Sequence, residues 1–234
     1  MVAYNTASIE RRDGYAAQLH VDGRVILDVL RWCFESLPDE VLVGMDPHPD
    51  RHHRPEVESM FRGRDEEVGL FAGQGYIVNE ARIVNRGDSY SVHHLPEDWT
   101  DDIFAPDRGV RGTRFTHWLH THPNAPAIPS GADADAAQET IGVDLILGVS
   151  FSPEGPLPWF DDVEGERRPF GEAPQAAPTR GRWFGRGSRP ILGIAPTGHR
   201  IHGLELIAFH RRGLGVNVVL VDEEGWPHGW PFTS

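Results

Sequence analysis

A pair of histidines at the end of an expected strand, followed by a serine-capped helix, constrains this chain more than any other feature. Residues 115–121 have the aromatic and β-branched content of a strand, and Pro123 ends it. Side chains on a strand alternate between its two faces, so His120 and His122 point the same way and can reach one metal ion. The pattern therefore predicts that two imidazoles share one site.

A carboxylate follows at the spacing at which a helix would return it to the strand. Pro129 and Ser130 predict the start of a helix, because serine is a favoured N-cap residue and an acidic residue stands three positions later. That residue, Asp133, is expected in the first helical turn, directed at the end of the strand. Two imidazoles and one carboxylate, with a fourth position left to water, form the open coordination of a catalytic zinc site. Each piece alone is usually structural, and only the combination indicates a metal.

The combined spacing resembles the signature of the JAMM (MPN+) zinc metalloprotease family, in which His-x-His is followed after seven residues by serine and after two more by aspartate. The matching residues are His120, His122, Ser130 and Asp133. The resemblance implies zinc as the cofactor and a prokaryotic-type, deubiquitinase-like isopeptidase as the activity.

The family also carries a glutamate, for which this sequence offers three candidates. Residues 66–73 resemble the family's first strand, where glutamate is followed by two residues, glycine, two apolar residues, one more residue and glycine. On this spacing the glutamate is Glu66. Glu67 is adjacent, and a slip of one residue on a strand reverses every side chain. Glu40 also competes, because an expected helix over 24–36 followed by Glu40 resembles the way in which the family introduces its glutamate.

The resemblance implies a role for each of these residues. His120, His122 and Asp133 would hold zinc. Glu66 would be the general base toward the metal-bound water and would then protonate the leaving amine. Ser130 would donate a hydrogen bond to the oxyanion of the tetrahedral intermediate. The implied reaction is hydrolysis of the isopeptide between a ubiquitin-like modifier and a lysine, with conjugates of a small archaeal or bacterial modifier or of a sulfur-carrier protein as the substrate.

Two alternatives to this function stay open at the level of sequence. One is a zinc peptidase that processes the C-terminus of a sulfur-carrier protein or cleaves ordinary peptide bonds. The other, from a different class, is an inactive MPN-type scaffold or interaction domain, although intact zinc ligands argue against it. A nucleic-acid deaminase of similar layout would need cysteine ligands, which Cys33 alone cannot supply.

The order of expected elements predicts a single domain of α+β class over residues 1–234. The resemblance implies a mixed, curved β-sheet flanked by helices in an α/β/α layered arrangement, similar to cytidine deaminases. It is strongest over 62–151 and extends to the strands within 201–222, whereas 152–189 is expected to be a long surface insertion. The further expected elements are a polar N-terminal segment over 1–16 that frays or forms a short strand, strands over 18–21, 41–43, 76–84, 89–93, 144–151, 201–211 and 215–222, helices over 55–61, 95–103 and 130–141, and a loop over 46–54.

Composition narrows the partners and the compartment. The net charge is −13, which argues against nucleic acid and anionic membrane surfaces as partners. A single cysteine excludes an intramolecular disulfide and suits a reducing compartment. Neither a signal peptide nor an apolar run of membrane-spanning length is present in the sequence, so we expect a cytoplasmic location. The oligomeric state is not indicated.

Overall fold

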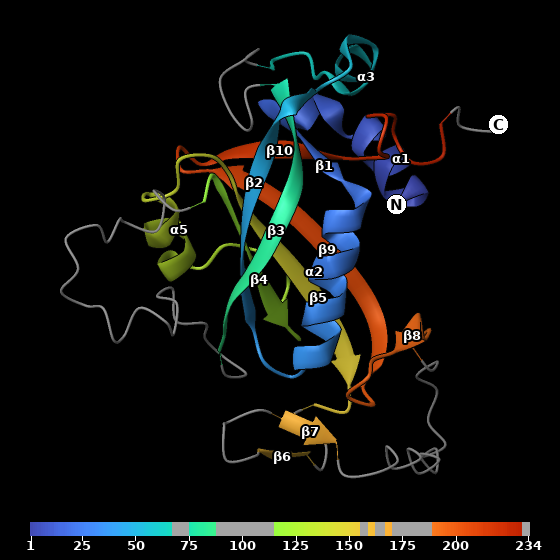
Figure 1. Cartoon of the computed structure of the whole chain (residues 1–234), viewed down its shortest axis with the longest axis vertical. Helices are drawn as coiled ribbons and strands as arrows, with labels where there is room; N and C mark the ends of the chain where they lie inside the picture. Colours follow the sequence, from blue (N-terminus) through green and yellow to red (C-terminus); the bar gives the residue numbers. More distant parts are fainter. Residues whose placement is uncertain (67–74, 88–114, 155–158, 162–166, 170–188, 231–234) are drawn as a thin grey trace.

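The computed structural model describes residues 1–66, 75–87, 115–154, 159–161, 167–169 and 189–230. One mixed sheet dominates the described part of the chain (Figure 1), with the strand order β10-β1-β3-β2-β4-β5-β9-β8. Its strands are β1 (Ala17–Asp22), β2 (Val41–His52), β3 (Tyr76–Arg86), β4 (His117–Pro123), β5 (Asp144–Ser152), β8 (Gly193–Ile194), β9 (Arg200–His210) and β10 (Leu214–Val221). The helices are α1 (Val2–Glu10), α2 (Gly23–Ser36), α3 (Pro55–Phe61) and α5 (Gly131–Ala137), with a short 3-10 turn at Arg12–Gly14.

The sheet closes on itself at one end. β1 runs parallel to β10 and β3, and β4 runs parallel to β5, whereas the other neighbouring strands are antiparallel. β9 and β10 form a hairpin in which Leu214 pairs with His210 and Gly215 with Phe209. This pairing joins the two ends of the series β10-β1-β3-β2-β4-β5-β9 into a seven-stranded barrel. The α/β/α layering implied by the family resemblance stays a prediction.

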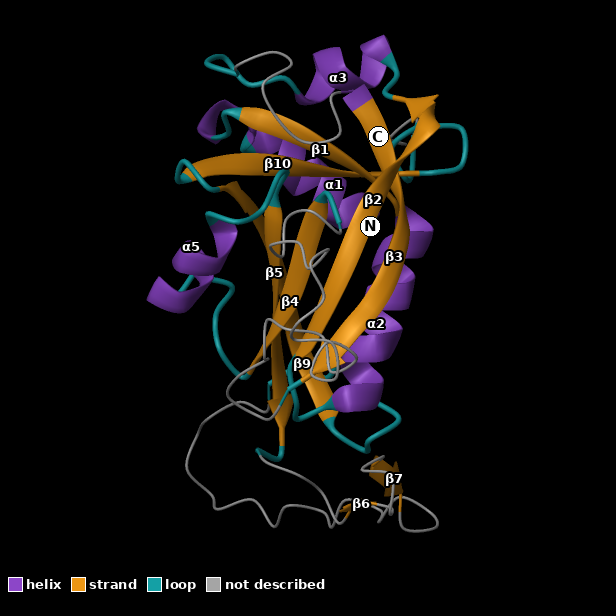
Figure 2. Cartoon of the chain, turned by 60° about the vertical axis from the view of Figure 1, so that its left-hand side comes forward, coloured by secondary structure: helices purple, strands orange, loops and turns teal. Residues whose placement is uncertain are grey.

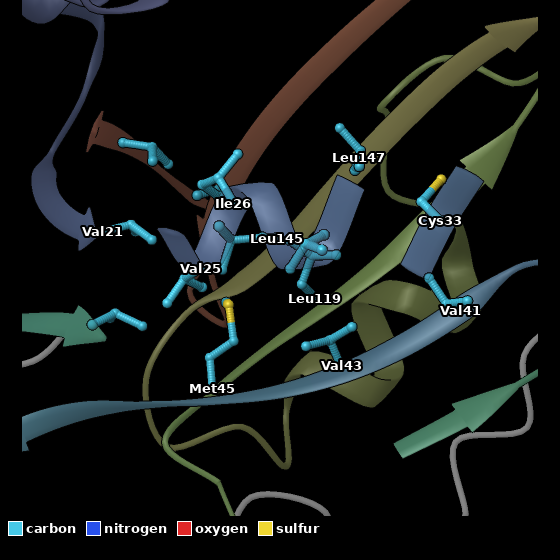
Figure 3. Packing of buried hydrophobic residues seen from close by; sticks show 14 of the residues in the cluster. Val21, Val25, Ile26, Cys33, Val41, Val43, Met45, Leu119, Leu145 and Leu147 are labelled. Atoms are coloured by element: carbon cyan, nitrogen blue, oxygen red, sulfur yellow. The ribbon is translucent and has the colours of Figure 1, made fainter. Parts of the chain in front are cut away.

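Helix α2 packs against one face of this sheet and fills the core. Asp22 caps the helix by accepting a hydrogen bond from the Arg24 N–H at 2.9 Å. The buried residues Val25, Val29 and Cys33 recur every four positions, which places them on one helical face. Figure 3 shows this face against side chains of β2, β4 and β5. Burial raises the pKa of the Cys33 thiol to about 12, so the single cysteine is a core residue and not a reactive thiol.

The position of β4 between β2 and β5 decides which of its side chains enter this core. Leu119 belongs to the cluster under α2, and Thr121 accepts a hydrogen bond from the Val41 N–H at 3.0 Å. Because alternate residues face opposite sides of a strand, His120 and Trp118 lie on the other face. There Trp118 packs with Leu42 in a separate small cluster. The two histidines thus share one face of β4, as predicted, and this face points away from α2.

Val2–Glu10 form a helix, so the expectation of a frayed or strand-like segment over 1–16 was wrong. The two buried residues of α1, Asn5 and Ser8, are polar, while Tyr4 and Ile9 pack partly buried against the core. The Asn5 side chain donates to the Leu220 carbonyl at 2.8 Å and accepts from the Leu220 N–H at 2.9 Å, and Ser8 donates to the Val218 carbonyl at 3.2 Å. α1 is therefore held on β10 by side-chain hydrogen bonds to the strand backbone. Such a helix has no apolar periodicity that a sequence pattern could reveal.

The expectation of a loop over 46–54 was also wrong, because β2 continues to His52. Two prolines and three histidines made this stretch resemble a loop, since proline cannot donate to a sheet ladder. The structure accommodates Pro47 at register shifts in the pairing with β3, between Asp46 and Pro47 and again before His52. Irregularities of this kind are where a strand tolerates proline.

Most other expected elements are present with small changes of boundary. The strands over 18–21, 76–84, 144–151, 201–211 and 215–222 are confirmed as β1, β3, β5, β9 and β10, the helices over 24–36 and 55–61 as α2 and α3, and the capped helix over 130–141 is the shorter α5. Residues 67–73 of the expected first family strand, and the strand and helix expected over 89–93 and 95–103, lie outside the described residues. Of the expected insertion over 152–189, the structure describes the ends and a two-stranded ribbon, β6 (Trp159–Asp161) with β7 (Arg167–Pro169). Within the described residues no helix combines the length and apolar content needed to cross a membrane.

The buried histidine His117 predicts how fold stability depends on pH. Burial lowers its pKa to about 3, and its Nδ1 accepts a hydrogen bond from the Val143 N–H at 3.2 Å. In the unfolded chain the same imidazole titrates near its ordinary value of 6.5. As the pH falls below about 6, His117 binds a proton in the unfolded state but stays neutral in the folded state. This difference should lower the free energy of unfolding by about 1.4 kcal/mol for each pH unit.

Urea unfolding of wild type and His117→Asn between pH 4 and 7 measures this term, since asparagine can accept the same backbone hydrogen bond. The variant should have the shallower profile. Parallel profiles for the two proteins would show that His117 is not held neutral.

Candidate metal centre

Strand β4 and helix α5 supply the candidate metal ligands, on the side of the sheet away from α2. Figures 1 and 2 show α5 and α2 on opposite sides of the sheet. His120 and His122 lie near the end of β4 and on the same face of the strand, and Asp133 lies in the first turn of α5. His120 and Asp133 are buried, and His122 is partly buried. The structure thus brings together the three residues that the sequence predicted.

The ligand atoms have the mutual spacing that a single ion requires. The two Nε2 atoms lie 3.0 Å apart, Asp133 Oδ1 lies 3.1 Å from His120 Nε2, and Asp133 Oδ2 lies 3.5 Å from His122 Nε2. Ligands at about 2.05 Å around a tetrahedral zinc ion are about 3.3 Å from one another. The observed distances lie on either side of that value. His120, His122 and Asp133 could therefore hold a metal ion.

A capping box fixes the direction of the Asp133 carboxylate. Ser130 Oγ accepts a hydrogen bond from the Asp133 N–H at 3.2 Å, and Asp133 Oδ2 accepts from the Ser130 N–H at 2.6 Å. The two bonds satisfy free N–H groups at the start of α5. They also anchor Asp133 before any ligand arrives, so the spacing Ser-x-x-Asp serves the helix and the site together.

The Asp133 carboxylate and the His122 imidazole each favour the charged form of the other. Burial alone would raise the Asp133 pKa, but hydrogen bonds with His120 and His122 outweigh it and hold the pKa well below its ordinary range. The hydrogen bond to Asp133 raises the pKa of His122, against an opposing effect of burial, and the Glu40 carboxylate adds to the rise. Without a cation in the centre, the site thus draws protons onto His122.

Of the two candidate glutamates that the structure describes, Glu40 is the one near the centre. β2 and β4 are antiparallel with Leu42 opposite His120 at the end of their pairing, and continuing this register by two residues would set Glu40 opposite His122. The effect of Glu40 on the His122 pKa agrees with this placement. Glu40 precedes β2, where its carbonyl accepts a hydrogen bond from the Gly87 N–H at 2.9 Å.

Glu66 lies elsewhere in the sheet. Its carboxylate accepts hydrogen bonds from Gln18 Nε2 on β1 at 2.8 and 3.1 Å. β1 is separated from β4 by β3 and β2, which is about 14 Å at the usual spacing of neighbouring strands. The structure therefore does not bring Glu66 together with His120, His122 and Asp133. Glu67 lies outside the described residues.

The same face of the sheet carries a cavity that the sequence gave no reason to expect. It measures about 270 Å³ and is lined by Gly44, Asp46, Glu80, Ala81, Arg82 and Phe115. Gly44 pairs with Trp118, which precedes His120 by two residues on β4. The cavity and the candidate metal centre are therefore offset by two residues along the strands on the same face of the sheet. A glycine is required there, because a Cβ on Gly44 would stand 2.3 Å from the Phe115 ring. Asp46 was expected in a loop, so no sequence signal linked it to this face.

One of the comparisons with known proteins hints at an MPN-type domain. No family model matches the chain. A mouse protein named as an MPN domain-containing protein is 32% identical over 84 residues, which is 32% of this chain and 16% of that protein, so the similarity spans about a sixth of its length. The solution structure of protein DSY2949 from Desulfitobacterium hafniense is 16% identical, with a TM-score of 0.29, over 64% of this chain and 90% of that one.

The arrangement predicts one zinc ion per chain, bound more weakly in acid. Each imidazole binds a metal ion only in its neutral form. Because the pKa of His122 is raised above its ordinary value of 6.5, protons should already compete with zinc for His122 at a pH somewhat above 6.5. Competition against a chromophoric chelator between pH 5.5 and 8 measures this affinity. Asp133→Asn should lower it by more than the roughly 10–100-fold typical of a residue outside the ligand shell.

Asp135→Asn provides the matched control for this loss, because Asp135 is an exposed carboxylate on the same helix. It should bind zinc as the wild type does. Equal losses in the two variants would indicate a diffuse electrostatic effect and contradict ligation by Asp133.

Proposed function

We propose that the chain is a zinc-dependent metallo-isopeptidase that hydrolyses conjugates of a small ubiquitin-like modifier or a sulfur-carrier protein. The observation that carries the proposal is the convergence of His120, His122 and Asp133 beside Glu40 and Ser130. A scaffold has no physical need for two imidazoles and a carboxylate whose ligand atoms converge on one point. The weak similarity to an MPN domain and the family signature in the sequence support the same class.

Zinc is the cation proposed for this centre, because two imidazoles and one carboxylate leave a fourth tetrahedral position open. When bound, it would supply Lewis-acid activation of a water molecule and lower the pKa of that water to about 7. The chain's own residues prepare the centre: the capping box at Ser130 holds the Asp133 carboxylate, and the Pro126 carbonyl holds the His122 ring at a distance of 2.9 Å from Nδ1. Both side chains are thus oriented before they ligate.

Glu40 is the proposed general base, in place of the expected Glu66. Glu40 contributes to the raised pKa of His122, which supports a position close to that imidazole, from which it would accept a proton from the attacking water and return it to the leaving amine. Glu66 is engaged by Gln18 on the far side of β3 and β2. The register of β2 against β4, and not the glycine spacing after Glu66, supports this assignment.

Ser130 is the proposed oxyanion donor. Its hydroxyl oxygen accepts the capping hydrogen bond from the Asp133 N–H, and this leaves the hydroxyl proton available to donate. The side chain is exposed at the start of α5, next to the Asp133 ligand. A single hydroxyl can therefore cap the helix and stabilise negative charge on a substrate carbonyl.

Substitution of the two glutamates tests the base assignment. On a modifier–lysine isopeptide, Glu40→Gln should lower kcat by about 10²–10⁴-fold while zinc content stays that of the wild type, because general acid–base catalysis contributes that much. Glu66→Gln should keep most of the activity, and a chelator should abolish it in every variant. A linear modifier fusion, assayed in parallel, separates an isopeptidase from a general peptidase.

The opposite result would be clear. Full activity in the presence of a chelator, or loss of activity in Glu66→Gln with Glu40→Gln unaffected, contradicts the proposal.

Removal of the Ser130 hydroxyl tests the second role. Ser130→Ala should reduce kcat by about 10²–10³-fold with KM little changed, as expected when an oxyanion donor is lost. It should also cost about 1 kcal/mol of unfolding free energy, because the helix loses its N-cap. Zinc content and urea unfolding, measured on the same sample, separate the two effects. An unchanged kcat would assign Ser130 to capping alone.

A further inference from the structure

The loop between β4 and α5 folds back over β5 and is held there at several points. The Asn124 N–H donates to the Val149 carbonyl at 2.8 Å, and Asn124 Oδ1 accepts from the Phe151 N–H at 2.8 Å. Asn124 has φ of 51°, the left-handed conformation that asparagine tolerates. The chain thereby reverses directly after the histidine strand, and residues 125–128 lie over β5.

A glycine on β5 provides the space for this loop. In the sheet, His122 pairs with Gly148, and Gly148 pairs with Glu205 on β9, so the three residues form one row across the strands. A Cβ on Gly148 would stand 2.9 Å from the Ala127 nitrogen and 3.1 Å from the Ala125 carbonyl oxygen. Because position 148 carries no side chain, the loop can lie between the other two members of the row.

One peptide unit of the loop contacts both His122 and Glu205. The carbonyl oxygen of Pro126 lies 2.9 Å from His122 Nδ1, and the N–H of Ala127 donates to Glu205 Oε2 at 3.2 Å. These two groups belong to the same planar peptide bond and point in opposite directions. A carboxylate on the N–H side fixes the plane of the peptide and polarises it, which strengthens the carbonyl as an acceptor.

We propose that Glu205 is a positioning residue for His122 and acts through the peptide bond between Pro126 and Ala127. The Pro126 carbonyl can only accept, so the His122 tautomer that it selects carries its proton on Nδ1. That tautomer presents the lone pair of Nε2, the atom that faces His120 at 3.0 Å. Glu205 fixes the carbonyl and thereby favours the metal-binding tautomer and ring orientation. The role in ligation rests on the proposed metal centre, whereas the role in tautomer selection belongs to the metal-free protein.

Glu205 is exposed, so its effect on His122 can be measured apart from any effect on the packing of the core. Glu205 is exposed on β9, whereas Ala127, which it contacts, is 2% exposed. Removing the carboxylate leaves the buried clusters around α2 intact, because neither residue belongs to them. Its effect should therefore appear at His122 and not in the overall stability of the protein.

The test compares Glu205→Ala and Glu205→Gln with Glu139→Ala. Glutamine keeps an oxygen acceptor for the Ala127 N–H without the charge. Glu139 is an exposed glutamate just after α5 for which the described part of the chain provides no side-chain hydrogen bond, so its removal matches the loss of charge alone. The readouts are the ¹⁵N chemical shifts of the His122 ring in the metal-free protein at alkaline pH, where the ring is neutral, and the zinc affinity, with thermal unfolding as a control.

Glu205→Ala should lower zinc affinity by about tenfold and shift the His122 ring nitrogens toward a mixture of tautomers. Glu205→Gln should stay within about threefold of the wild type, because it keeps the hydrogen bond, and Glu139→Ala should match the wild type. Wild-type behaviour of Glu205→Ala in both readouts would overturn the proposal, as would a Glu205→Gln variant as weak as Glu205→Ala. Absence of zinc binding in the wild type would refute the metal centre, while the ring shifts would still decide the role of Glu205.

Discussion

The register of β4 between β2 and β5 is the constraint on which the candidate centre depends. Leu119 lies in the core under α2, and Thr121 accepts a hydrogen bond from the Val41 N–H. These two inward residues fix which side of the strand the histidines occupy. A slip of one residue would turn both imidazoles into the apolar core and expose Leu119, at a large cost in buried apolar surface. Continued by two residues, the same register would set the proposed base Glu40 opposite His122, so the core of the protein would align the proposed base as well as the candidate ligands.

Structural and chemical roles coincide at several residues of the centre. Ser130 and Asp133 satisfy N–H groups at the start of α5, as a capping box does in many helices. The same two hydrogen bonds direct the Asp133 carboxylate toward His120. The loop before α5 likewise stabilises the end of β4 and provides the carbonyl that orients His122. The ligands are thus held by groups that the fold already needs, so little ordering remains when a cation binds.

Local patterns in the sequence predicted the ligands well, because strand alternation and helix capping are properties of a few neighbouring residues. His120, His122, Ser130 and Asp133 lie within fourteen positions of one another, and the structure brings all of them together. The proposed base, Glu40, comes from a different segment, directly before β2. Its position depends on how β2 pairs with β4, which a glycine spacing after Glu66 cannot report.

The failures in predicting the fold have similar causes. The two buried residues of α1, Asn5 and Ser8, are polar and bond to the backbone of β10, so apolar periodicity gave no signal for a helix. β2 runs through Pro47 because register shifts absorb the proline, which only the partner strand can reveal. Glu205 is some 80 residues from the loop that it contacts, and no motif connects the two. Contacts between distant segments, and not local preferences, account for what the sequence did not predict.

Anomalous diffraction from zinc-loaded crystals tests the central claim most directly, because it locates the cation and the glutamates in one experiment. The account predicts a single zinc peak about 2.0–2.2 Å from His120 Nε2, His122 Nε2 and an Asp133 carboxylate oxygen. It also predicts the Glu40 carboxylate as the nearest glutamate to the open position of that ion. Zinc bound elsewhere, or Glu66 nearer than Glu40 to the ion, would contradict it.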